Sequence, residues 1–176
     1  MARRLLPAEV RTERLLLRQW RPEDAEPLSE IYVQPEYLEF FMIEYDLEGT
    51  RAQIERWQRM WDEEGLSQWA VEELASGRLI GRIGLLRHDD WPLEEAPVVE
   101  VGWTLHRDWW GRGLATEGGR ASVEAWRERL PDEQRLHSFT VPANLRSRAV
   151  MERVGLTHRG ETFWRGHYHV WYAIDR

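Results

Sequence analysis

The sequence predicts an α+β fold in which a mixed β-sheet is flanked by helices. Three observations lead to this class. Residues 67–86 contain two consecutive strand patterns around a turn, residues 98–105 form a short apolar strand, and helical segments at 114–130 and 142–156 each precede a further strand. Consecutive strands pair antiparallel, whereas a helix between two strands permits a parallel crossover, so one sheet is expected to contain both kinds of pairing.

The first part of the chain reads as one strand followed by three helices. The strand is expected at 12–20, where apolar and polar residues roughly alternate, and the helices at 21–34, 35–42 and 46–65. Pro22 suits the start of the first helix, because the amide hydrogen that proline lacks would have no partner there.

The strands of the second part begin with the hairpin at 67–86. Its turn contains Gly77, which tolerates the positive φ that hairpin turns require. Further strands are expected at 136–141, 157–164 and 167–175. The chain therefore predicts a sheet of about six to seven strands.

The composition is that of a globular protein. The 176 residues suit one domain spanning 1–176, and 42% of them are hydrophobic. No apolar run approaches the roughly 20 residues of a membrane helix, and the N-terminus lacks a signal-peptide pattern. There is no cysteine, which excludes disulfides, thiolate metal sites and a cysteine nucleophile. We therefore expect a cytoplasmic protein that does not associate with membranes.

The charge limits the classes of partner. The net charge of -7 argues against a nucleic-acid binder, which would present a basic face. All 24 basic residues are arginine, so no lysine is available for a Schiff base or a phosphate-binding P-loop. Tryptophan occurs 11 times, which fits core and pocket walls and also leaves a homodimer interface open. The histidines show no metal-ligand spacing, so no metal is expected.

A glycine-rich turn lies between the strand at 98–105 and the helix at 114–130. It reads Trp-Gly-Arg-Gly-Leu-Ala-Thr from Trp110 to Thr116. Glycines allow backbone amides to converge, and a helix N-terminus carries partial positive charge, so such a turn can bind a phosphate group. A simple connecting turn is the alternative. Walker A and Rossmann fingerprints do not fit, because the lysine and the third glycine are missing.

Four segments in order resemble the GNAT superfamily of N-acetyltransferases, and within it the RimJ/RimL branch of ribosomal-protein N-terminal acetyltransferases. They are TERLLLRQWRPEDAEPL, LIGRIGL, EVGWTLHRDWWGRGLATEGGRA and NLRSRAVMERVGLTHRGE. The resemblance covers nearly the whole chain. It implies a bacterial enzyme with a strongly twisted mixed sheet whose central strands are splayed apart, and acetyl-CoA as cosubstrate without a metal.

The resemblance also implies where acetyl-CoA lies. The turn would hold the pyrophosphate, the strand edge would pair with pantetheine, and an Asn-x-x-Ser motif would lie near the thioester. The corresponding residues are Trp103, Thr104, Leu105, Trp110, Gly111, Arg112, Gly113, Leu114, Ala115, Thr116, Asn144 and Ser147. Trp110 replaces the Gln or Arg usual in the family, which indicates packing rather than hydrogen bonding there.

Acetyl transfer to an amine requires a base, oxyanion stabilisation and protonation of the leaving thiolate. Glu100 is the candidate base, because a charged residue within the strand VVEVGWTL is costly unless it faces a cleft or a partner. A solvated Glu100, one paired with arginine, and a water chain as base are alternatives. Met151 occupies the position of the tyrosine acid of many GNAT enzymes, so Ser147 is the substitute expected near the sulfur, with a surface-polar role as its alternative.

The acceptor is expected to be a primary amine, with a protein N-terminal α-amine as one candidate. Acidic residues cluster in two loops with aromatic residues close by, and carboxylates beside aromatic faces would attract ammonium groups. The acidic members are Glu44, Asp46, Glu48, Asp89, Asp90, Glu94 and Glu95. Ordinary solvated loops are the alternative. A CoA- or acyl-CoA-binding sensor without catalysis is the competing function.

Overall fold

The structure is a computed structural model that describes residues 6–41, 45–93 and 96–176. Its centre is one eight-stranded sheet with the order β1-β2-β3-β4-β5-β6-β8-β7. All neighbouring strands are antiparallel except β5 and β6. The strands are β1 (Glu9–Arg11), β2 (Leu15–Arg18), β3 (Gln68–Glu73), β4 (Arg78–His88), β5 (Val98–Leu105), β6 (Arg135–Thr140), β7 (Thr157–Trp164) and β8 (His167–Asp175).

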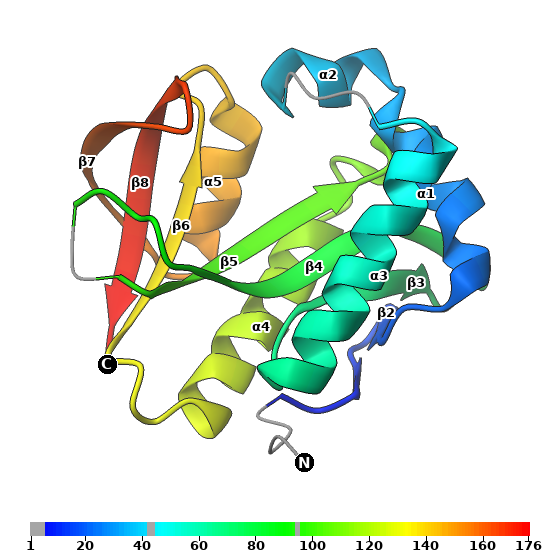
Figure 1. Cartoon of the computed structure of the whole chain (residues 1–176), viewed down its shortest axis with the longest axis horizontal. Helices are drawn as coiled ribbons and strands as arrows, with labels where there is room; N and C mark the ends of the chain where they lie inside the picture. The colour runs from blue at the N-terminus through cyan, green and yellow to red at the C-terminus, as the bar shows by residue number, and fades with distance from the viewer. Residues whose placement is uncertain (1–5, 42–44, 94–95) are drawn as a thin grey trace.

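Helices cover both faces of the sheet (Figure 1). They are α1 (Ala25–Tyr32), α2 (Pro35–Phe41), α3 (Leu47–Glu63), α4 (Leu114–Arg129) and α5 (Leu145–Arg153). Helices α1 and α3 pack together on one face, and α4 packs on the other beside α5. No helix in the described part of the chain is long and apolar enough to cross a membrane.

Each face has its own hydrophobic core. Between the sheet and α4, Ile83, Val101 and Trp126 are fully buried. On the opposite face, Leu28 and Trp57 belong to the core formed with α1 and α3. The alternation of side chains along each strand supplies these two faces, because successive residues point to opposite sides of the sheet.

The central strands β5 and β6 separate after a short parallel contact. Val99 pairs with Leu136 and Glu100 with His137, and the Ser138 hydroxyl donates a 2.8 Å hydrogen bond to the Val101 carbonyl. Within the described residues, the part of β5 at 102–105 pairs only with β4. The expected splaying of the central strands is confirmed, and it leaves one backbone edge of β5 open.

The N-terminal strand prediction was wrong in part. The structure shortens the strand expected at 12–20 to β2 at Leu15–Arg18. A further strand, β1 at Glu9–Arg11, precedes it and pairs with it as a hairpin, which raises the number of strands to eight. Thr12 makes the turn, because its amide donates to the Leu15 carbonyl at 2.9 Å and its hydroxyl accepts from the Leu15 amide at 3.0 Å. Threonine bonds its neighbouring backbone readily, so it competes with an extended strand.

Two predicted helix starts were also too early. Pro22 opens a 3₁₀ turn at Pro22–Asp24, and the α-helix α1 begins only at Ala25. Helix α5 begins after Asn144, whose side-chain oxygen accepts from the Ser147 amide, so Pro142 lies outside the helix. In the second case the capping side chain, rather than the proline, sets the first turn.

Candidate active site

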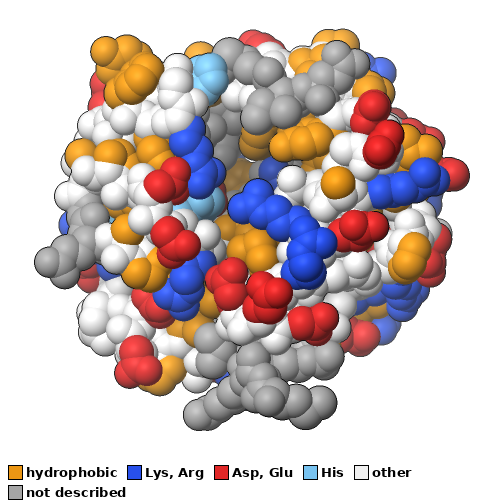
Figure 2. Space-filling model, in the orientation of Figure 1, with side chains coloured by type: hydrophobic (Ala, Val, Ile, Leu, Met, Phe, Trp, Pro, Cys, Tyr) orange, Lys and Arg blue, Asp and Glu red, His pale blue; other side chains and the backbone are white. Residues whose placement is uncertain are grey.

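One cavity of about 1480 Å³ extends from the open edge of β5 to the helices α1, α2 and α3. Figure 2 shows this face of the molecule hollowed near its centre, with arginine and histidine side chains around the hollow. Of the site residues predicted from the sequence, all line the cavity except Arg112. The cavity therefore brings together predicted site residues that are up to 47 positions apart in the sequence, from Glu100 to Ser147.

The glycine-rich turn forms one end of the cavity. Gly111 and Gly113 have φ values of 74° and 77°, in the left-handed region that favours glycine. Gly113 is the N-cap of α4, and the Glu117 amide donates to the Gly113 carbonyl at 3.0 Å, which closes the first turn of the helix. The preceding amides of Leu114, Ala115 and Thr116 have no partner within the helix, so this end of the cavity offers donors and the positive pole of α4.

Glu117 fixes this turn to the N-terminal hairpin. Its carboxylate accepts from the Thr12 hydroxyl at 2.6 Å, the Arg14 amide at 2.8 Å and the Arg14 Nε at 2.7 Å. Burial opposes ionisation, but the hydrogen bonds from Thr12 and Arg14 outweigh it and lower the pKa of the Glu117 carboxyl. Arg14 also donates to the Arg112 carbonyl at 2.8 Å, so the loop backbone is held from two sides.

Two side chains of the turn differ from expectation. Trp110 packs against the core as predicted, but its indole Nε1 also donates a 2.7 Å hydrogen bond to the Leu105 carbonyl, so the expectation of packing alone was wrong. Arg112 does not line the cavity, and its guanidinium lies 5.9 Å from the centre of the ring of Trp109, which does. The arginines that do line the cavity are Arg14, Arg82, Arg120, Arg146, Arg153 and Arg165.

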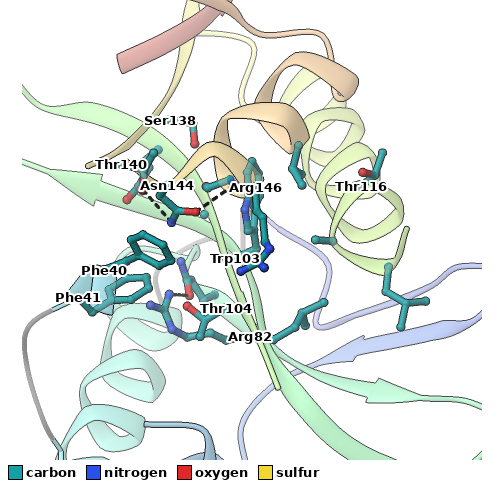
Figure 3. A pocket seen from close by; sticks show the side chains of 18 of the residues that line it. Phe40, Phe41, Arg82, Trp103, Thr104, Thr116, Ser138, Thr140, Asn144 and Arg146 are labelled. Carbon is teal, nitrogen blue, oxygen red and sulfur yellow. Dashed lines mark hydrogen bonds between the residues drawn. The ribbon is translucent and has the colours of Figure 1, made fainter. Parts of the chain in front are cut away.

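The Asn-x-x-Ser segment borders the open edge of β5 (Figure 3). The Asn144 Nδ2 donates to the Thr140 hydroxyl at 3.1 Å, and its Oδ1 accepts from the Ser147 amide at 3.1 Å. Asn144 therefore joins α5 to the end of β6. The Ser147 hydroxyl makes no hydrogen bond to another described residue, whereas Met151 is buried in the core and faces away from the cavity.

Glu100 lies in the middle of the cavity and is paired with a histidine. The distance between Glu100 Oε2 and His88 Nε2 is 2.7 Å, and the two side chains are only 12% and 10% exposed, respectively. The His88 ring packs edge-on against Phe139 and Trp164, with ring centres 5.3 and 5.2 Å away. The point that a Cβ at Gly102 would occupy lies 3.2 Å from the other carboxylate oxygen, Oε1, and 3.1 Å from Gln68 Nε2, so any side chain at this position would crowd both groups.

The far end of the cavity is aromatic and surrounds one arginine (Figure 3). Arg82 Nη1 donates to the Gln68 Oε1, and the guanidinium lies 5.5 Å from the ring centre of Trp57 and 5.8 Å from that of Phe41. The other aromatic residues that line this end are Tyr32, Tyr37, Phe40 and Tyr45.

With the fold and cavity described, comparison with known proteins identifies the family. Residues 14–157 match the family described as acetyltransferase (GNAT) domain. The chain belongs to the GNAT acetyltransferase family. A 147-residue alignment with the uncharacterised protein YkkB of Bacillus subtilis (strain 168) shows 26% identity and covers 82% of this chain and 83% of YkkB.

Solved structures agree on the fold. An acetyltransferase from Agrobacterium tumefaciens strain C58 is 27% identical, with 96% of this chain and 94% of that chain covered and a TM-score of 0.77. The aminoglycoside acetyltransferase AAC(6')-Ib in complex with paromomycin and acetyl-CoA is 21% identical, with 93% and 94% covered and a TM-score of 0.78. The eight-stranded mixed sheet is thus the GNAT arrangement.

The predicted acidic approach to the acceptor is not found among the described residues of this GNAT domain. Asp89 and Asp90 do not line the cavity, and Asp90 instead binds Arg165 with contacts of 2.8 and 2.9 Å. Asp46 caps α3 by accepting from the Gly49 amide at 2.7 Å, and Glu48 is exposed on the first turn. The remaining members, Glu44, Glu94 and Glu95, lie outside the described residues.

Sequence reasoning missed His88 and Arg82. Both lie on β4, where they point to the same face as Glu100 and Thr104 of β5. Their importance depends on the β4–β5 register, because Leu86 is paired with Glu100 and Arg82 with Thr104. Alternation along 78–88 could have placed them on one face, but only the register brings His88 to Glu100.

Two histidines of β8, His167 and His169, also line the cavity. Burial lowers the pKa of His169, so its ring is neutral over a wider pH range than that of an exposed histidine. No group of three His, Cys, Asp or Glu side chains that could hold a metal ion occurs among the described residues.

Proposed function

We propose that this protein is an N-acetyltransferase that moves the acetyl group of acetyl-CoA to a primary amine by direct attack in a ternary complex. The observation that carries this proposal is the continuity of the cavity. The glycine turn and the open β5 edge form one end, the Glu100–His88 pair lies in the middle, and the aromatic walls form the other end. Two substrates can therefore meet beside one carboxylate.

The residues at the first end fit acetyl-CoA. The turn at 110–116 would hold the pyrophosphate with backbone amides, since Gly111 and Gly113 keep the space above the backbone free of side chains. The edge of β5 at 103–105 would pair with pantetheine as an additional strand, because β6 has already diverged there. Asn144 and Ser147 would lie near the thioester.

Glu100 is suited to accept the proton of the attacking amine. Its Oε1 faces the space above Gly102, and His88 holds the other oxygen. The amine nitrogen forms a bond to the thioester carbonyl carbon, the carbon–sulfur bond breaks, and the amine proton passes to Glu100 directly or through water. The Ser147 hydroxyl would supply a proton to the leaving sulfur. Met151 cannot, because a thioether has no proton to donate, and the side chain is also buried in the core.

We assign the chain to the RimJ/RimL branch on the four sequence segments that resemble it, and propose a cytoplasmic bacterial enzyme with 1–176 as one domain. AAC(6')-Ib, which shares this fold, has been solved with paromomycin and acetyl-CoA, which supports an amine as the acceptor class here. A CoA-binding sensor is the second candidate function, favoured by the core position of Met151 where many family members carry a tyrosine acid.

Release of free thiol with a panel of primary amines tests the proposal. Glu100→Gln is expected to lower kcat by about 10²- to 10⁴-fold, the usual contribution of a general base, while the Kd of acetyl-CoA stays unchanged. Glu124→Gln is the matched control, because Glu124 also lines the cavity but is exposed on α4. Acetyl-CoA binding without turnover of any amine would favour the sensor.

A further inference from the structure

Among the described residues, the arginine at the acceptor end of the cavity has no negatively charged partner. Arg82 contacts a neutral carboxamide and two aromatic faces, and it forms no ion pair within the described residues. Its Nε is buried and has no hydrogen-bond partner there. An arginine carries its charge at every physiological pH, so the charge cannot be removed by deprotonation. A buried donor of this kind is costly unless a ligand supplies the acceptor.

A second interior arginine shows how this fold neutralises such a charge. Arg18 is 6% exposed and is bound by Asp24 through two hydrogen bonds of 2.8 Å, and also by Glu72. Two carboxylates thus serve a structural arginine. Arg82 has neither, although it faces a cavity in which a ligand carboxylate could take the same place.

The groups around Arg82 cannot provide the missing charge. Burial raises the pKa of the Tyr32 and Tyr37 phenols, against the opposing effect of Arg82, so both remain neutral. Of the described carboxylates that line the cavity, three have other partners: Glu36 binds Arg107 at 3.2 Å, Glu117 binds Arg14, and Glu100 binds His88. The other two, Glu13 and Glu124, are exposed and form no ion pair with Arg82. The guanidinium therefore remains available to an anion that enters the cavity.

The spacing along the sheet fits a substrate with two charged ends. Arg82 pairs with Thr104 across the β4–β5 ladder. Thr104 lies four residues beyond Glu100 on the same face of β5, so the Cα atoms of Glu100 and Thr104 are roughly 13 Å apart. Gly102 lies between them and has no side chain, and the Gln68 Nε2 lies 3.1 Å from the point that a Cβ at Gly102 would occupy, so a substrate that spans the two would contact the Gln68 amide. The aromatic rings of Phe41 and Trp57 enclose the apolar part of such a molecule.

We propose that Arg82 binds a carboxylate of the acceptor, so that the substrates are primary amines that carry a carboxylate and an apolar body, such as amino acids. This inference rests on the proposed acetyl transfer and specifies its substrate class. It replaces the cation-attracting approach expected from the sequence with an anion-binding subsite. Planar bidentate recognition of a carboxylate is the use to which an arginine fork is best suited.

The test compares amines that differ only in the carboxylate: phenylalanine with phenylalaninamide, leucine with leucinamide, and 5-aminopentanoate with pentylamine. For at least one pair, the wild-type protein is expected to acetylate the acid with a kcat/KM at least about tenfold above that of its neutral partner. An α-amino amide has a less basic amine than its acid, so amine basicity favours the amide and cannot produce this preference.

Arg82→Gln is expected to abolish the preference while the Kd of acetyl-CoA and the melting temperature stay near wild type. Arg82→Lys keeps the charge but not the fork, and should retain part of the preference. Arg87→Gln is the control, since Arg87 lies on the same strand, pairs with Glu133 at 2.9 Å and does not line the cavity.

Calorimetric binding of each acid and amide in the presence of CoA separates this inference from the proposed function. Arg82-dependent binding of an acid without turnover would support the subsite and contradict acetyl transfer. Acetylation of acids and neutral partners at equal rates, or an Arg82→Gln variant that loses acetyl-CoA affinity but keeps the preference, would overturn the subsite alone. Absence of any acid binding or preference would also overturn it.

Discussion

The two ends of the cavity are built from different parts of the chain and from different atoms. The end beside α4 uses backbone: two left-handed glycines, the first amides of a helix and the unpaired edge of β5. The opposite end uses side chains, with Arg82 on β4 surrounded by rings from α1, α2 and α3. A backbone site is specified within a few neighbouring residues, whereas a side-chain site depends on the packing of distant elements.

This difference bears on how each end can change. The backbone end depends little on the side chains of its turn, since Arg112 does not line the cavity and its guanidinium lies over the Trp109 ring. At the side-chain end, one substitution alters the charge or shape offered to a substrate. We therefore expect the first end to be fixed by the cosubstrate and the second to determine which acceptor is used.

The largest expected effect is at Gly113. Gly113→Val introduces a β-branched side chain at φ 77° and fills the space above the α4 amides. CoA affinity should fall by at least about 100-fold, or ~2.7 kcal/mol. Gly77→Val is the matched control, because Gly77 has φ 66°, open space around it and no place in the cavity. Calorimetric titration measures the CoA affinity of both variants. If Gly113→Val bound CoA as tightly as Gly77→Val, the assignment of the pyrophosphate to the backbone of this turn would be wrong.

The next effect separates the proposed base, Glu100, from the histidine proposed to position it. His88→Gln should lower kcat by about 10- to 100-fold, less than Glu100→Gln, because Glu100 remains but loses the partner 2.7 Å away. The double variant should be no slower than Glu100→Gln alone, since residues that act as a unit are not additive. The pH profile of kcat/KM should shift in His88→Gln. An unchanged profile with a lower melting temperature would show that the role is structural.

A smaller effect distinguishes the two polar residues of α5. Asn144→Ala removes the N-cap and should lower the free energy of unfolding by roughly 1 kcal/mol. Ser147→Ala keeps the backbone amide that donates to Asn144, so its stability should stay near wild type while kcat falls about tenfold. Urea unfolding and steady-state kinetics on both variants measure the two effects. A Ser147→Ala variant with full activity would remove the hydroxyl from the mechanism.

The smallest effect is the pH dependence of stability due to His169. Its pKa is lowered in the folded protein, so below the ordinary value of about 6.5 the unfolded state binds more protons than the folded state. The contribution is therefore present above that pH and is lost as the pH falls through the folded pKa. His169→Asn should flatten the fall in unfolding free energy between about pH 7 and 5. An identical slope in both proteins would contradict the shift.

The sequence located the backbone end more fully than the side-chain end for physical reasons. Gly111 and Gly113 precede a helix directly, so a local pattern defines their geometry, and Asn144 lies next to the helix that it caps. Arg82 and His88 gain their places from the register of β4 against β5, which no local pattern specifies. The acidic residues at 89–90 were misassigned because a charge run does not reveal its partner, and Asp90 finds Arg165 75 positions away.

Glu117 connects the glycine-rich turn at 110–116 to the N-terminal hairpin. Its hydrogen bonds reach Thr12, 105 positions earlier, and the Arg14 amide, 103 positions earlier. Contacts of such sequence separation close long loops, and they form only after the ordering entropy of the intervening chain has been overcome. During folding, the glycine turn can adopt its local conformation early, but the contacts that hold it against the first hairpin belong to the late, non-local stage of assembly.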